Sequence, residues 1–157
     1  MTRWMVGVGT VALAVAAFAG PAAAKTADPC KLLKGSEIQE QFGAEVSVPD
    51  RGLKTATTVE CTWDVAASPT RPAGSVTARI MFVGGKAAYT GLKTSPAFVP
   101  VAGLKSSLYQ ASSGALGVLA GKNLVTVQGV FLTPPPVSVV DVQAQLVPLA
   151  KLASKRA

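Results

Sequence analysis

The chain has 157 residues, a formal net charge of +7 and no histidine. The missing histidine excludes Ser-His-Asp and Cys-His catalysis, His-ligated zinc and histidine proton relays. The two cysteines are too few for a cysteine-rich structural zinc site, so we expect neither a metal nor another cofactor.

The first 24 residues have the layout of a secretory signal peptide. Arg3 gives a basic start, residues 5–19 form an uncharged apolar run, and Ala22-Ala23-Ala24 offers small residues for cleavage before Lys25. The apolar run is shorter than the roughly 20 residues that a membrane-spanning helix needs. We therefore expect an exported protein, periplasmic or secreted, with no transmembrane segment after cleavage. Residues 25–157 would form a single domain with a net charge of +6, because only Arg3 is lost.

The mature chain opens with short helical signals. Asp28-Pro29 is typical of a helix N-cap followed by a proline in the first turn, and that turn carries Cys30. Ser36 with Gln39 three residues later fits a capping box and predicts the start of a second helix. Gly43 predicts its end.

A β-hairpin follows. Residues 44–48 favour a short strand, and residues 50–52 favour a turn after it. Residues 57–65 and 75–83 then alternate apolar and polar side chains, which is typical of half-buried strands. The connection 67–74 contains two prolines and a glycine, so the two strands are predicted to pair antiparallel.

The second half repeats this mixture of helix and strand. Residues 86–93 predict a short helix, and residues 94–106 a loop. Three further strands are expected at 107–111, 116–120 and 124–132, the last two joined by a tight turn at 121–123.

A final helix ends the chain. Ser138 with Asp141 predicts its cap, and Pro148 predicts a kink. Its apolar residues recur at three- and four-residue intervals: Val139, Val142, Leu146, Leu149 and Ala153. Antiparallel strands with helices on one face predict an α+β two-layer sandwich, with the N-terminal helix tied to the sheet and the C-terminal helix packed on it.

The two cysteines predict a structural disulfide. Cys61 lies on the apolar face of its strand and Cys30 in the leading helical turn, so a bridge would fasten that turn to the sheet. Export places both in an oxidising compartment. The alternative, a redox-active pair, would favour a C-x-x-C spacing, which the chain lacks.

Other chemistry finds little support in the sequence. A Ser-Lys dyad is formally possible where Lys105 precedes Ser106 and Ser107, although serines beside a lysine are common in ordinary loops. Nucleic-acid binding would favour exposed aromatics between basic residues, whereas the aromatics here, Trp63 among them, fall at core positions. We therefore expect no catalytic residues, no enzyme activity and no nucleic-acid partner.

Several short motifs resemble a known family. They are Asp28-Pro29-Cys30 with Leu32-Leu33, Phe42-Gly43, Cys61-x-Trp63 and residues 101–104 (Val-Ala-Gly-Leu). Together they resemble a domain-of-unknown-function family of actinobacterial cell-envelope lipoproteins. The resemblance implies an α+β fold with a helix tied to the sheet by the two cysteines, and the family supplies no established enzymatic activity. Lys25 stands where that family often has a lipid-attachment cysteine, so we expect no lipid anchor.

These observations favour an exported, non-catalytic envelope binding protein. Its partner would be an anionic envelope component or another protein, because the basic excess favours anionic partners. Loops 66–74 and 94–106 would carry recognition if they flank one end of the sheet, through Arg71, Lys93 and Lys105. The alternatives are an inhibitor-like protein that blocks an envelope hydrolase through one of these loops, and a hydrolase of unfamiliar design.

Overall fold

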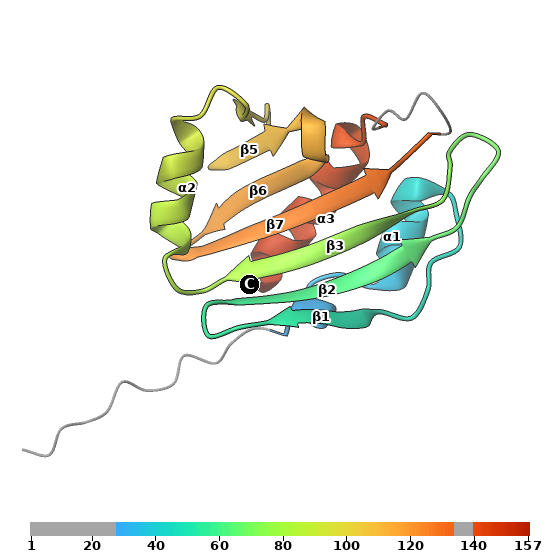
Figure 1. Cartoon of the computed structure of the whole chain (residues 1–157), viewed down its shortest axis with the longest axis horizontal. Helices are drawn as coiled ribbons and strands as arrows, with labels where there is room; N and C mark the ends of the chain where they lie inside the picture. Colours follow the sequence, from blue (N-terminus) through green and yellow to red (C-terminus); the bar gives the residue numbers. More distant parts are fainter. Residues whose placement is uncertain (1–27, 134–139) are drawn as a thin grey trace, which may run out of the picture.

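The computed structural model describes residues 28–133 and 140–157. Within these ranges the chain forms one seven-stranded antiparallel sheet with helices packed behind it (Figure 1). The signal peptide expected at residues 1–24 lies outside the described residues. The predicted α+β class is confirmed, with a C-terminal helix and an N-terminal segment joined to the sheet by a disulfide.

The strand order across the sheet is β1-β2-β3-β7-β6-β5-β4. The predicted hairpin is present as β2 (Thr58–Val65) and β3 (Gly74–Met81), and β3 also pairs with β7 (Asn123–Phe131). The other side of β7 pairs with β6 (Ala115–Ala120), followed by β5 (Ser107–Gln110) and the two-residue β4 (Val99–Pro100). A short 3-10 turn, η2 (Ala111–Ser113), connects β5 to β6.

The edge strand β1 (Asp50–Lys54) corrects the sequence prediction, which placed a turn at 50–52 and a strand at 44–48. Residues 44–48 form only an isolated bridge, between Val46 and Val65. The strand signal at 50–54 was missed because every residue of β1 is exposed, so no apolar alternation marks it. The β1–β2 register shifts between Arg51 and Lys54, which indicates a β-bulge.

The helical segments begin with η1 (Pro29–Lys31), where the Asp28 side chain accepts a hydrogen bond from the Cys30 N–H at 3.1 Å, as expected for an N-cap. Helix α1 (Gly35–Phe42) follows and ends at Gly43 in the left-handed conformation, as predicted. Its start differs from the prediction. The Lys34 N–H donates to the Glu37 carboxylate at 2.9 Å, so Glu37 takes the role assigned to Gln39.

Helix α2 (Gly85–Lys93) confirms the predicted short helix and packs beside one end of β6 and β7. Helix α3 (Gln143–Arg156) lies behind the sheet with α1 (Figure 1). Its predicted apolar stripe is buried at Val142, Leu146, Leu149 and Ala153, whereas Val139 and Ser138 lie outside the described residues. Asp141 accepts from the Gln143 N–H at 3.0 Å, and the helix runs on through Pro148.

The core lies between the sheet and the layer formed by η1, α1 and α3. Its largest buried side chains include Trp63, Tyr109 and Phe131. The Cys30–Cys61 disulfide is present, with the two Cα atoms 5.2 Å apart, and joins η1 to the middle of β2. Arg156, at the C-terminal end of α3, links this helix to the N-terminal part of the layer. Its guanidinium donates to the Leu32 carbonyl at 2.8 Å and to both oxygens of Glu37 at 2.6 and 2.8 Å.

Candidate functional site

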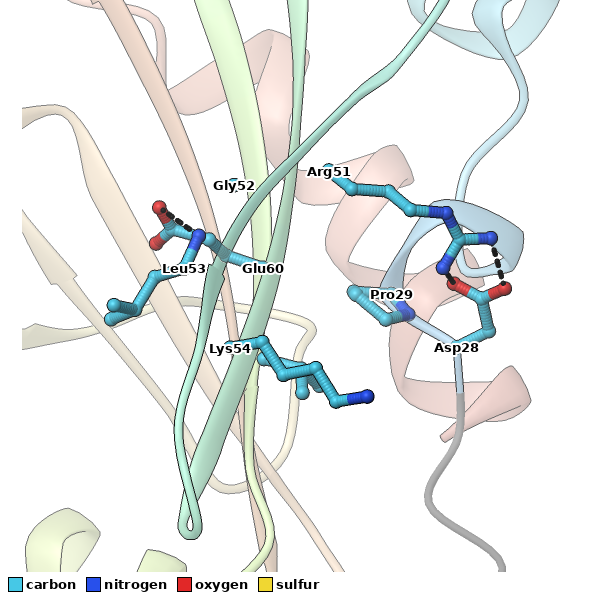
Figure 2. A pocket seen from close by; sticks show the side chains of 8 residues that line it. Asp28, Pro29, Arg51, Gly52, Leu53, Lys54 and Glu60 are labelled. Atoms are coloured by element: carbon cyan, nitrogen blue, oxygen red, sulfur yellow. Dashed lines mark hydrogen bonds and ion pairs between the residues drawn. The ribbon is translucent and has the colours of Figure 1, made fainter.

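A pocket of about 230 Å³ lies between η1 and the edge strand β1 (Figure 2). Asp28 and Pro29 line it from η1, and residues 51–54 line it from β1. Val59 and Glu60 of β2 complete the lining. The disulfide and the Asp28 cap hold η1 in place, and the pairing with β2 holds β1.

The two carboxylates of this pocket are fully engaged. Asp28 accepts two hydrogen bonds from the Arg51 guanidinium, at 2.9 and 3.3 Å, across the mouth of the pocket (Figure 2). That contact is the main cause of the lowered pKa of Asp28. A carboxylate held ionised in this way does not serve as a general acid near neutral pH.

Glu60 is held equally firmly. Its carboxylate accepts from the Leu53 N–H at 3.1 Å and from Arg79 at 2.7 and 3.0 Å. Burial alone would raise the pKa of Glu60, but the Leu53 N–H and the Arg79 guanidinium outweigh it, so the pKa is lowered. The Glu60 side chain also accounts for the glycine at position 52, because a Cβ there would lie 2.8 Å from Oε1 of Glu60.

Lys54 differs from the other charged residues of the pocket. The ion pairs among the described residues join Arg51 to Asp28, Arg79 to Glu60 and Arg156 to Glu37, and none uses a lysine. Figure 2 shows the Lys54 side chain extending toward Pro29 and Asp28, whereas Leu53 lies on the other side of β1. The pocket therefore carries two neutralised carboxylates and one ammonium group in excess.

Lys54 also belongs to a larger group of lysines at one end of the sheet. Four connections lie at this end: β1–β2, β3–α2, β4–β5 and β6–β7. The Phe82 N–H donates to the Thr57 carbonyl at 3.0 Å, and the Leu119 N–H donates to the Ser106 carbonyl at 2.9 Å. These connections and the adjoining helix α2 carry five exposed lysines, which we call the basic end: Lys54, Lys86, Lys93, Lys105 and Lys122.

The opposite end of the sheet is acidic. There β2 and β3 meet where Val65 pairs with Gly74, and the Val140 N–H donates to the Phe131 carbonyl at 3.1 Å. The exposed carboxylates toward this end are Glu45, Asp64 and Asp141, and Asp50 lies partway along the edge strand, opposite Thr62. An eight-residue strand spans about 26 Å at 3.3 Å per residue, which exceeds the Debye length of about 8 Å at physiological salt. The two ends therefore present separate fields to a partner in solution.

This arrangement separates the three residues that the sequence grouped as a partner-binding set. Lys93 and Lys105 belong to the basic end, whereas Arg71 lies in the β2–β3 loop at the acidic end. The condition set for recognition, that loops 66–74 and 94–106 flank one end of the sheet, is therefore not met. The reason is the register: β5 begins at Ser107 opposite Val118, far along the sheet from the Val65–Gly74 pair.

Arg71 is also half-buried rather than a free surface charge. Its guanidinium lies over the rings of Phe42 and Phe131, 5.0 and 5.1 Å from their centroids. The two rings stack with centroids 5.0 Å apart. With the Gln145 amide turned so that its oxygen faces Arg71, that oxygen accepts from Nη2 at 3.2 Å. Arg71 therefore anchors the loop to the core through cation–π contacts.

The serine–lysine arrangement noted in the sequence is not assembled as a dyad. The Ser107 hydroxyl is buried and donates to the Leu104 carbonyl at 2.6 Å, while Lys105 is exposed. Among residues 28–133 and 140–157, no group of three metal-ligating side chains comes together.

Comparison with protein-family models, with curated proteins and with solved structures gives no match for this chain. In the part of the chain that the structure describes, no helix is long and apolar enough to cross a membrane.

Sequence reasoning missed both the pocket and the polarity of the sheet. The pocket depends on an exposed edge strand whose residues carry no periodic signal. The basic end combines lysines from four separate stretches of sequence, and only the strand register brings them together. One signal was available: four of the five lysines fall in predicted turns or at the ends of a predicted helix.

Proposed function

We propose that this chain is an exported, non-catalytic binding protein that recognises an anionic component of the cell envelope through its basic end. The observation that carries this proposal is the gathering of five exposed lysines at one end of the sheet, none in an ion pair with another described residue, while most exposed acids lie toward the other end. A surface with this field attracts anions and orients the protein as it approaches them. The signal peptide expected at residues 1–24, with Lys25 after it, fits a periplasmic or secreted protein. The resemblance to envelope lipoproteins supports a location in the cell envelope.

The state of the carboxylates supports binding rather than catalysis. The two in the pocket are engaged by arginines, and a third, Glu37, is held by Arg156, whose hydrogen bonds are the main cause of its lowered pKa. An enzyme that used such groups as acid and base would need them free to exchange protons at working pH.

Vesicle binding tests the proposal. Near an anionic membrane each lysine contributes about 1 kcal/mol, so replacing Lys86, Lys105 and Lys122 by glutamine should cost about 3 kcal/mol, a loss of more than a hundredfold in affinity at low salt. The probe is a vesicle containing phosphatidylglycerol, compared with one of phosphatidylcholine alone. Capture by the anionic vesicle alone, falling with added salt, is the expected result.

A matched control removes the same charge elsewhere. Lys31, Lys34 and Lys151 are exposed and lie on the helical layer, outside the connections and the helix α2 that define the basic end. Their glutamine variant should bind the anionic vesicle within a few fold of the unmodified chain. Equal losses from the two triple variants would mean that net charge alone governs capture, and the proposal would be wrong.

One observation favours the alternative function, an inhibitor-like protein that blocks an envelope hydrolase through a loop. The tip of the β2–β3 loop is closed by two backbone hydrogen bonds between Ser68 and Arg71, at 2.9 and 3.2 Å, and Arg71 fixes it to the aromatic pair. A loop held in one conformation loses little entropy on binding. If this loop blocks an enzyme, Arg71→Ala should weaken inhibition of an envelope hydrolase activity while leaving vesicle capture unchanged. The third possibility, a hydrolase of unfamiliar design, finds no support in this geometry.

A further inference from the structure

We infer that the pocket between η1 and β1 is a binding site for a single anionic group carrying a short apolar substituent, such as an alkyl phosphate or a short fatty carboxylate, with Lys54 as its charge partner. This goes beyond the proposed function, which concerns an extended anionic surface. It assigns a small-molecule site to a defined pocket at the margin of the basic end.

The charge balance of the pocket favours an anionic ligand. Asp28 is neutralised by Arg51, and Glu60 by Arg79, at nitrogen–oxygen distances of 2.9 and 2.7 Å. The Lys54 ammonium has no ion-pair partner among the residues that the structure describes, and it extends into the pocket (Figure 2). An anionic group placed beside it supplies the missing partner, and a compact ammonium is a common partner for phosphate and carboxylate oxygens.

The apolar part of the lining selects the substituent. The Pro29 side chain is buried in this wall, and Val59 packs against the edge of the core beside it. A ligand with a hydrocarbon group would cover this surface, whereas a bare ion would leave it in contact with water. At about 230 Å³ the pocket is smaller than the roughly 300 Å³ at which drug-sized sites begin, so it suits a small group rather than a whole cofactor.

The two walls are held in place before any ligand binds. Arg51 and Asp28 form a two-point contact across the pocket mouth, and Glu60 fixes the bulge of β1 through the Leu53 N–H. Preorganised walls lower the entropic cost of binding. The Arg51 side chain is 73% exposed, so its bridge to Asp28 leaves the pocket accessible.

Titration of the full chain with octyl phosphate below its micelle concentration tests the inference, with inorganic phosphate and 1-octanol as comparison ligands. We expect octyl phosphate to bind at least tenfold more tightly than either. Lys54→Met, which keeps the length of the side chain and removes its charge, should weaken octyl phosphate binding about tenfold. Lys122→Met, at the basic end but outside the pocket lining, should leave it unchanged.

Each contrary result overturns a specific part of the inference. Unchanged binding to Lys54→Met would exclude Lys54 as the charge partner, and equal binding of inorganic phosphate would exclude the apolar contact. Vesicle capture separates the sources of the anion: loss of capture in Lys54→Met far beyond that in Lys122→Met would identify a lipid headgroup as the occupant. Because the triple lysine variant at Lys86, Lys105 and Lys122 retains the pocket, it should still bind octyl phosphate even where vesicle capture fails.

Discussion

The disulfide offers the sharpest test of how this fold is held together. Cys30 and Cys61 are 31 positions apart, so the bridge closes a loop of 32 residues when both cysteines are counted. The chain-entropy relation for such a loop gives about 3.7 kcal/mol at 25 °C, because the bridge restricts the unfolded chain. That is a large share of the roughly 5–15 kcal/mol by which a domain of this size is stable.

The perturbation is Cys30→Ala with Cys61→Ala, compared with the unmodified chain before and after reduction. Equilibrium unfolding in urea, followed by far-ultraviolet circular dichroism, measures the free energy of unfolding of each. Reduction keeps both sulfur atoms and should lower stability by about 3–4 kcal/mol. The double variant should lose somewhat more, because Cys61 is fully buried in the core cluster that also contains Trp63.

A loss below about 1 kcal/mol on reduction would refute this reasoning. It would mean that the Arg156 contacts with Leu32 and Glu37 hold the N-terminal segment without help from the disulfide. An intermediate loss of stability could be accompanied by a steeper dependence of the unfolding free energy on urea concentration. That result would place part of the effect in the unfolded state, as the loop-entropy account requires.

Two further predictions concern a glycine and a tyrosine. Gly114 has φ 58° and its backbone bonds to Gly129, whose carbonyl a Cβ would overlap. Gly114→Ala should therefore lose about 3 kcal/mol, against about 1 kcal/mol for Gly121→Ala, where φ is 61° and the space is open. Thermal unfolding compares the two, and equal losses would contradict the overlap. Burial, with a 3.0 Å bond to Asp141, raises the pKa of Tyr109 to about 12. Tyr109 ionises at lower pH in the unfolded chain than in the folded one, so the free energy of unfolding should fall by about 2 kcal/mol between pH 10 and 12. Tyr109→Phe should abolish this fall and Tyr89→Phe should not; a fall of the same size in Tyr109→Phe would assign it to other groups.

The elements that the sequence predicted are those whose burial leaves a pattern. Strands β2, β3 and β7 each bury one face, so apolar residues alternate along them, and α3 buries a stripe at helical spacing. The disulfide was predictable for the same reason, because Cys61 falls on the buried face of β2. Gly43 predicted the end of α1, because glycine readily adopts the left-handed conformation in which helices often end.

The elements that escaped prediction depend on contacts between distant residues. β1 is held by the bulge contact of Glu60 with the Leu53 N–H, which no local periodicity reveals. Arg71 looked like a loop charge because the two rings beneath it, Phe42 and Phe131, come from opposite halves of the chain. The candidate site follows the same rule, since the strand register alone decides which lysines meet.

Arginines and lysines make different contacts in this structure. The ion pairs within the described ranges use arginine, whose planar guanidinium meets both oxygens of Asp28 and of Glu37, and Arg71 uses the same planarity to lie over two rings. The lysines that the structure describes form no ion pair with another described residue, and five of them lie at one end of the sheet. Were their charge only a means to solubility, lysines could be spread evenly over both ends. Their separation from Glu45, Asp64 and Asp141, which lie toward the other end of the sheet, is what an anion-binding surface requires, because acids placed among them would cancel its field.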